Sequence, residues 1–373
     1  MTLLLLARTI GVASACGNTA DGAKEDTKNA AEATRDAAAT SDAAAASAGA
    51  SMDGAADDTA VGTDVTSGMS RFSLRCFRPL LLGAALIALP SNVFAWGDAG
   101  HRLTGLAAAQ KLPDDMPAFF RAASQRLAYL NPEPDRWKDR AESALDPALT
   151  GGTSPDHYID MDLAAPAVLA SALRSANRYG FGDTLRTVGI SASTMGLLPF
   201  TILEQAQRLR GDFRLWRIAP DSTTRSWIEA RIIDDAGLLG HYIADGSNPA
   251  HTTKHHNGWV GENPKSYATD NRFHSRFESA YVQAHITLPD VMDGMTNTPR
   301  VFPDLRAAVI AYLGTTFSQL DRLYEIDKRM PWQPASTNAE QKAFASERLA
   351  AGAEMLRDVW YTAWITSAPI GAP

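Results

Sequence analysis

The strongest constraint on the fold is the spacing of apolar residues, which repeats with the period of an α-helix over four long stretches. In the second stretch, Ile232, Leu239 and Ile243 fall near one helical face. No segment shows the sustained alternation of a β-strand, and no tandem repeat is evident. The pattern therefore predicts an all-α protein. The four stretches cover residues 195–209, 224–245, 307–324 and 340–364.

Proline, glycine, asparagine and aspartate gather between the helical stretches and predict long loops. These loops are expected around residues 129–156, 246–272 and 328–338. All of the helical stretches lie between residues 96 and 373, so we expect a single multi-helix domain there.

The first 68 residues are of a different kind. From about residue 21 to residue 69 they consist mainly of Ala, Asp, Thr, Ser and Gly, with almost no large apolar side chain. Such a segment buries too little surface to offset the entropy of ordering it, so we expect disorder over residues 1–68. The apolar leader that ends at Cys16 loosely resembles a lipoprotein signal. A start codon assigned too far upstream is the alternative, which we favour.

Residues 69–95 have the layout of a secretory signal peptide. A basic start is followed by an apolar run from Leu80 to Leu89, then by Pro90 and a small residue at Ala95. The apolar run is too short to span a bilayer as a stable helix. We therefore predict cleavage after Ala95 and a secreted or periplasmic protein of residues 96–373, without a transmembrane segment.

The two cysteines, Cys16 and Cys76, both precede the predicted cleavage site. A processed chain would have no thiolate, so any metal must be held by His, Asp and Glu. The net charge of −7 also argues against a fold-wide basic surface for duplex nucleic acid.

All 8 histidines follow residue 95, and most of them stand beside carboxylates. In "GHYIADGSNPAH", His241 and Asp245 are four residues apart and share a helical face. The Asn-Pro pair that follows should end the helix, so that His251 can return toward the same point. "FHSRFES" repeats the four-residue spacing with His274 and Glu278.

A third motif, "DHYIDMD", places His157 among three aspartates. A single pair of this kind is more often a surface pair or a satisfied buried hydrogen bond than a metal site. Several such motifs in an exported chain without cysteine favour a metal centre. His255 and His256, by contrast, stand in a loop rich in glycine and asparagine, where we expect solvated histidines.

Together the motifs resemble those of the superfamily of zinc-dependent phospholipases C and fungal-type single-strand nucleases. The matching stretches are Trp96-Gly97 with His101, then "HYIDMD", "HYIADGSNPAH" and "FHSRFE", which extend the resemblance over nearly all of residues 96–373. Glu278 is the phospholipase-like choice at its position. The long gap between His251 and His274 is nuclease-like, and the chain stands nearer the nuclease branch.

The resemblance implies a cleft with three zinc ions. In that superfamily the processed chain begins with tryptophan, whose free amino group and carbonyl oxygen both bind zinc. The implied ligands are Asp135, His157, His241 and Asp245 for one ion, His251, His274 and Glu278 for a second, and Trp96, His101 and a bridging Asp245 for the third. Asp139 is the alternative to Asp135.

The activity implied is hydrolysis of phosphodiester bonds by a zinc-activated hydroxide, with Asp135 orienting the attacking water or accepting its proton. Single-stranded DNA or RNA is the expected substrate, and Tyr158 is the expected platform for an unstacked base. Trp259 and Phe273 are weaker candidates for that platform. Phospholipid is the alternative substrate, and a metal-binding protein without activity is a third interpretation. No stable protein partner is predicted.

Overall fold

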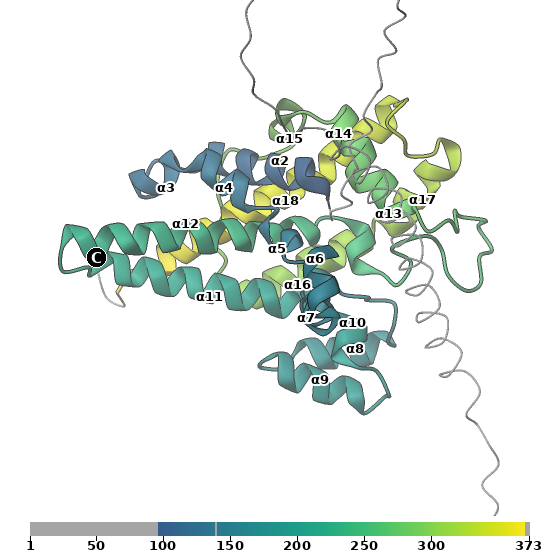
Figure 1. Cartoon of the computed structure of the whole chain (residues 1–373), viewed down its shortest axis with the longest axis horizontal. Helices are drawn as coiled ribbons and strands as arrows, with labels where there is room; N and C mark the ends of the chain where they lie inside the picture. Colours follow the sequence, from purple (N-terminus) through teal and green to yellow (C-terminus); the bar gives the residue numbers. More distant parts are fainter. Residues whose placement is uncertain (1–95, 139, 370–373) are drawn as a thin grey trace, which may run out of the picture. The chain divides into compact units, whose positions relative to one another are not determined.

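The computed structural model describes residues 96–138 and 140–369, which form helices and connecting loops without a β-sheet (Figure 1). The prediction of an all-α fold is confirmed. Within these residues the one β pairing is an isolated bridge between Gln333 and Ser336. The predictions for residues 1–68 and 69–95 lie outside the described residues.

The elements are α2 (Gly97–Gln110), α3 (Ala118–Ala122), α4 (Ser124–Leu130), α5 (Glu133–Arg136), α6 (Arg140–Leu145), α7 (Pro147–Thr153), η1 (Ser154–His157), α8 (Pro166–Leu173), α9 (Arg178–Arg186), α10 (Ala192–Met195), α11 (Leu198–Arg217), α12 (Ser222–Asp245), η2 (Pro249–Thr252), α13 (Phe273–Ser275), η3 (Arg276–Tyr281), α14 (Val282–His285), α15 (Leu288–Asp293), α16 (Leu305–Phe317), α17 (Leu320–Arg329) and α18 (Ala339–Thr366).

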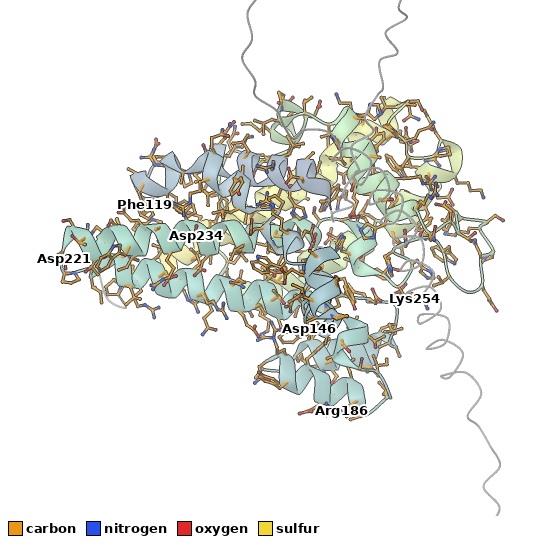
Figure 2. The ribbon with its side chains drawn as sticks, in the orientation of Figure 1. Phe119, Asp146, Arg186, Asp221, Asp234 and Lys254 are labelled. Carbon is orange, nitrogen blue, oxygen red and sulfur yellow. The ribbon has the colours of Figure 1, made fainter. Side chains whose placement is uncertain are left out.

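Helix α12 is central, because it packs against α2, α4, α11 and α18. It forms a long hairpin with α11, and Asp221 marks the turn between them while Asp234 lies farther along α12 (Figures 1 and 2). Asp221 caps α12, since its carboxylate accepts a hydrogen bond of 2.7 Å from the N–H of Thr224. The helix is mostly exposed at this end and mostly buried from Ile232 to Asp245. Its last turn therefore delivers side chains into the core.

Two glycines let the end of α4 approach α12 closely. A Cβ atom at Gly237 would lie 2.4 Å from the Cβ of Leu130, and one at Gly240 would lie 2.3 Å from Nδ2 of Asn131. Real Cβ atoms do not approach other atoms so closely, so these positions exclude a larger residue in this packing. The close contact places Asn131 directly against the buried end of α12.

Helix α18 is the longest helix of the described chain and packs against α2, α11 and α12 (Figure 1). Its buried face includes Leu349, Met355, Leu356 and Val359, which lie in the stretch 340–364 that the sequence predicts as an amphipathic helix. Among the helices of the described residues, none combines the length and apolar character needed to cross a bilayer.

The helices differ from the sequence prediction in two main places, and the loop predicted over 246–272 also contains the short helix η2. The predicted helix over 307–324 breaks into α16 and α17, where the N–H of Gln319 bonds to the carbonyl of Thr316 and tightens the turn. The loop predicted over 129–156 contains the short helices α5, α6 and α7. Proline stands in the first turn of α5 and opens α7, and this position favours a helix start rather than a loop.

Gly196 lies just before α11, and its main chain packs against the segment around residue 158. Its φ of +90° is a left-handed conformation, and a Cβ atom there would lie 2.0 Å from the carbonyl oxygen of Tyr158. That oxygen also accepts a hydrogen bond of 3.2 Å from the N–H of Leu198. Gly196 therefore sets the position of the segment that carries His157.

We expect Gly196→Ala to lower the free energy of unfolding by about 3 kcal/mol or more, because it adds both backbone strain and a clash. Urea denaturation measures the change. Gly189→Ala is the matched control, since Gly189 has a φ of +80° but a Cβ atom there would have no atom within 4 Å. The control should cost about 1 kcal/mol. Equal losses in the two variants would contradict the role of the Tyr158 contact.

Candidate metal centre

Asp245 lies at the centre of a buried cluster of histidines. Its Oδ2 is 3.1 Å from Nδ1 of His157 and 3.3 Å from Nε2 of His241. Its Oδ1 is 3.5 Å from Nε2 of His101 and 3.8 Å from Nε2 of His251. The four imidazoles come from α2, η1, α12 and η2, so the two oxygens of one carboxylate connect four separate elements.

Asp135 of α5 faces the same cluster from the other side. Its carboxylate oxygens lie 3.7 Å from Nε2 of His241, 3.8 Å from Nδ1 of His157 and 3.9 Å from Nε2 of His101. An ion pair of 2.8 Å joins it to Nζ of Lys138, a residue that no sequence motif singled out. Asp135 thus lies beside three of the predicted histidine ligands, on a short helix and not in a loop, whereas Asp139 lies outside the described residues.

His251, His274 and Glu278 form a second group beside the first. Nε2 of His274 is 2.6 Å from Oε2 of Glu278, and Nε2 of His251 is 3.4 Å from the same oxygen. The side chain of Asn248 donates a hydrogen bond of 3.0 Å to this oxygen. Glu278 stands on η3, a π-helical turn, and such wider turns often occur at functional sites. The three side chains that the sequence predicts for one ion therefore lie together.

Opposing effects set the protonation of these groups. Burial acts to raise the pKa of Asp245, but the imidazoles of His251 and His241 outweigh it and hold that pKa well below its ordinary value. Burial lowers the pKa of His241 to about 4, with the ring of His101 acting in the same direction. At His251 burial acts to lower the pKa, but Asp245 and Glu278 raise it to about 9. The ionised carboxylates thus attract positive charge into the cluster.

Several buried polar atoms of the cluster lack hydrogen-bond partners in the described part of the chain. They include Nε2 of His101, Nε2 of His157, Oδ1 of Asp245 and, apart from the ion pair with Lys138, both oxygens of Asp135. Unpaired buried polar atoms are costly, and a cation among them would satisfy several at once. These buried groups could therefore bind metal ions. The ligand atoms gather within 4.8 Å of one another in three sets, which are His101, Asp135 and His241; His157, His241 and Asp245; and His251, His274 and Glu278.

Trp96 is fully buried beside this cluster. Its indole Nε1 donates a hydrogen bond of 2.7 Å to the carbonyl of Ala244, the residue before Asp245, and its ring packs 5.4 Å from that of Phe277. The carbonyl of Trp96 accepts the first hydrogen bond of α2, from Gly100. This hydrogen bond fixes the main chain at residue 96 beside the end of α12. The resemblance implies that the amino group and carbonyl of Trp96 bind zinc there.

The aromatic residues near the centre have different environments. Tyr158 is partly buried, its hydroxyl donates a hydrogen bond of 2.7 Å to the carbonyl of Ser193, and burial raises its pKa to about 12. Phe273 is fully buried and stacks on Tyr324 with ring centroids 4.1 Å apart, so its face is not open to a ligand. Tyr158 thus keeps part of its surface exposed, whereas Phe273 does not.

The prediction that His255 is a solvated loop residue is wrong. It is buried and stacks on Trp259 with ring centroids 3.9 Å apart. Asp162 holds this part of the loop, because its carboxylate accepts hydrogen bonds from the hydroxyl of Thr253 and from the N–H of Lys254. His255 and Trp259 therefore pack within the loop, and the ring of His255 covers one face of Trp259.

Asn131 is a further residue of the centre that no sequence motif singled out. Its side-chain oxygen lies 2.9 Å from Nδ1 of His101, and its main-chain oxygen lies 2.9 Å from Nδ1 of His241. Because an oxygen of this kind only accepts, both rings must carry their proton on Nδ1 and present Nε2 to the cluster. Asn131 therefore orients two of the candidate ligands.

We expect Asn131→Ala to weaken metal binding by about 10–100-fold, because it releases the ring of His101 while His241 keeps its main-chain partner. Competition with a chromophoric chelator measures the affinity. Asn297→Ala is the matched control, since Asn297 only accepts a hydrogen bond from Lys111 at the surface. Unchanged metal affinity in Asn131→Ala would show that the hydrogen bond does not position the ligand.

Asp160 is a buried carboxyl close to the centre but outside the three sets of ligand atoms. Burial, together with the charge of Asp162, raises its pKa to about 7. The stability gained from the neutral carboxyl is fully present below the unfolded-state pKa of about 3.9 and is lost as the pH rises through 7. Metal-free protein should therefore lose stability over this range.

We expect Asp160→Asn to be more stable than the parent chain at pH 8 by about 2–4 kcal/mol and nearly equal to it at pH 4, because the amide does not ionise. Urea denaturation of chelator-treated protein at both pH values measures the difference. Asp183→Asn is the control, since Asp183 is an exposed partner of Arg186. A difference that does not change with pH would contradict the assignment.

Comparison with protein-family models, with curated proteins and with solved structures gives no match for this chain. Function must therefore be inferred from the chemistry of the cluster itself.

Proposed function

We propose that this chain is a zinc-dependent phosphodiesterase that hydrolyses single-stranded DNA or RNA. The observation that carries the proposal is the position of Asp245, whose two oxygens face four imidazoles in one buried cluster. A carboxylate shared in this way suits adjacent metal ions, which sit about 3.5–4 Å apart in many phosphoryl-transfer sites. The proximity of the second group, at His251, His274 and Glu278, supports a centre with several ions.

The donor set favours zinc over other metals. It consists of imidazole nitrogens and carboxylate oxygens, and both cysteines of the sequence precede residue 96. Two of the three sets share His241, whose single unprotonated nitrogen can bind one ion. The proposed third ion is therefore the one implied by the resemblance, held by Trp96, His101 and a bridging Asp245. Bound zinc would supply a water of lowered pKa and positive charge against the phosphate.

The chain's own residues provide the remaining functions. Apart from the ion pair with Lys138, the carboxylate oxygens of Asp135 have no hydrogen bond in the described chain, so Asp135 can orient the attacking water or accept its proton. Lys138 lies beside it with a side chain that is 21% exposed, which allows the amine to contact an oxygen of an incoming phosphate. The partly exposed ring of Tyr158, next to His157, can stack on an unpaired base.

Activity and metal content measured together test this function. The protein is incubated with single-stranded DNA, duplex DNA, RNA and phosphatidylcholine vesicles, with and without a chelator, and bound metal is counted. We expect about three zinc ions per chain and chelator-sensitive cleavage of the single strands in preference to the duplex.

Each other outcome points to a different function. Cleavage of phosphatidylcholine alone would support the phospholipase C alternative. Bound zinc without activity on any substrate would support a metal-binding protein without catalysis. Activity that survives removal of all metal would overturn the proposal.

A further inference from the structure

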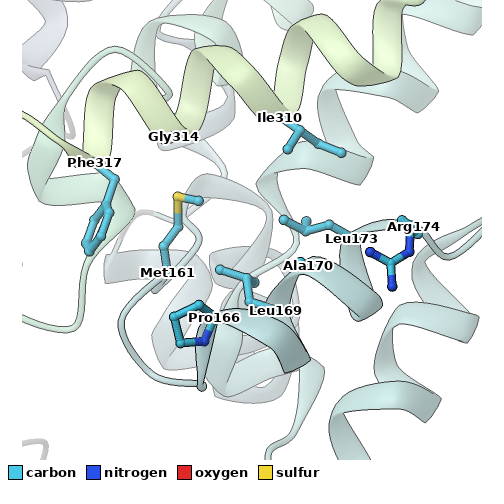
Figure 3. Close-up of a pocket in the computed structure, with 9 residues that line it drawn as sticks. All are labelled: Met161, Pro166, Leu169, Ala170, Leu173, Arg174, Ile310, Gly314 and Phe317. Atoms are coloured by element: carbon cyan, nitrogen blue, oxygen red, sulfur yellow. The ribbon is translucent and has the colours of Figure 1, made fainter.

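An apolar cavity lies between α8 and α16 and has a volume of about 440 Å³ (Figure 3). Its size is within the range of small-molecule sites, about 300–1,000 Å³. None of the candidate metal ligands lines it. We call this cavity the apolar groove. It is lined by Met161, Pro166, Leu169, Ala170, Leu173, Arg174, Ile310, Gly314 and Phe317.

Helix α16 lines one side of the apolar groove. The middle residue of its lining face is a glycine, which has no side chain. Ile310, Gly314 and Phe317 follow one another at helical spacing on this face (Figure 3). A Cβ atom at Gly314 would have no atom within 4 Å, so the space in front of it is open. A glycine inside a helix is less favourable than alanine by about 0.5–1 kcal/mol. Here it leaves the groove unfilled.

The opposite side of the apolar groove is also apolar, and a positively charged arginine lies at one end of it. Leu169 and Leu173 of α8 point into the groove, while Arg174 lies at one end of the row of lining residues and Phe317 at the other (Figure 3). Arg174 is exposed and is the single charged residue of the lining. A second guanidinium lies close by, because Arg306 donates a hydrogen bond of 2.9 Å to the carbonyl of Ser175. Positive charge therefore gathers at this end.

The base of the apolar groove is held in place by the main chain near the metal centre. The N–H of Met161 donates a hydrogen bond of 3.0 Å to the carbonyl of Thr252, and that of Ile159 donates one of 2.9 Å to the carbonyl of His251. Met161 thus extends the segment that carries His157. The apolar groove is a preformed feature of the fold and is separate from the metal ligands.

We propose that the apolar groove binds a single alkyl chain with an anionic head group, such as a carboxylate or a phosphate. The chain would lie along the apolar lining from Phe317 to Leu173, and the head group would meet Arg174. A sugar or a nucleobase fits poorly, because apart from Arg174 the lining side chains offer no hydrogen-bond donor or acceptor to its polar edges. The binding does not depend on the activity of the metal centre.

Calorimetric titration of the full chain with dodecanoate tests the proposal. We expect dodecanoate and dodecyl phosphate to bind at one site, and dodecyltrimethylammonium to bind at least about tenfold more weakly, because it lacks the anionic head. Comparison of the two anions identifies the preferred head group, and inorganic phosphate alone shows whether the alkyl chain is required. The titrations are repeated after chelator treatment, which should leave the affinity unchanged.

Two substitutions locate the site. Gly314→Leu should reduce dodecanoate affinity at least about tenfold, because the new side chain occupies the open space, and it should not lower the melting temperature. Gly211→Leu is the matched control, since Gly211 is also a helical glycine with no atom within 4 Å of a Cβ position. Arg174→Gln should weaken binding of the anions about tenfold and should not weaken binding of the cation, because the substitution removes a like charge.

The proposal is overturned if dodecanoate does not bind, or if Gly314→Leu binds it as tightly as the parent chain. It is also overturned if the cationic amphiphile binds as well as the anionic one. Loss of phosphodiesterase activity with intact dodecanoate binding would count against the proposed function alone, and the reverse result would count against the apolar groove alone.

Discussion

Replacement of Asp245 by asparagine is expected to remove most of the bound metal and to lower phosphodiesterase activity by about a thousandfold or more. The amide has nearly the same shape but lacks the negative charge that four imidazoles face. Because Asp245 is proposed to bind two ions, both ions should be lost together. Metal analysis of the purified variant and its rate on single-stranded DNA measure the two effects.

The matched control for this prediction is Asp234→Asn. Asp234 stands on the same helix but is exposed and pairs with Arg126 at the surface (Figure 2). Its replacement should leave both the metal content and the rate within about twofold, since an exposed ion pair contributes little. If Asp245→Asn keeps the metal content of the parent chain, the shared position of this carboxylate between ions is wrong.

A single residue placed ahead of Trp96 is expected to remove one metal ion and to lower activity about 100-fold. The free amino group exists only in a chain that begins at this residue, and an amide nitrogen does not replace it as a ligand. The buried indole, bonded to the carbonyl of Ala244, would hold the chain end beside the cluster in either case. The added residue therefore removes the terminal amine as a ligand but leaves the buried indole of Trp96 in place.

Two chains that differ by one N-terminal glycine provide the measurement. One begins at Trp96 and the other begins with glycine followed by Trp96. Metal counting and single-strand cleavage are compared between them, and sequencing the N-terminus of exported protein identifies the natural start. Equal metal content in both chains would show that the terminal amine is not a ligand, and an N-terminus other than Trp96 would contradict the predicted cleavage.

The long helices could be predicted because their signals are local. The periodic apolar residues of α11, α12 and α18 each lie within one stretch of sequence, and the structure forms these helices where the pattern indicates. The break after α16 could not be predicted, since Leu320 and Tyr324 continue the apolar period into α17 while the chain turns. The helices between residues 133 and 153 are too short for periodicity to reveal them.

The candidate site was predictable only in its local pairs. The spacing of His241 from Asp245 places both on one helical face, and the structure brings them within 3.3 Å. Asn131 gave no comparable signal, because its partner His241 is 110 residues away and meets it through the close approach at Gly240. Contacts of this range depend on how whole helices pack, and residue spacing alone does not contain that information.

The packing of α2 against α18 has a consequence for the order in which the protein folds. These are the first and the last helices of the described chain, and they lie in direct contact. Because α2 precedes α18 in the chain, the part of the α2 surface that contacts α18 stays uncovered until α18 has been made. Contacts between segments so far apart in sequence form slowly, so we expect the α2–α18 contact to be among the last to form in folding.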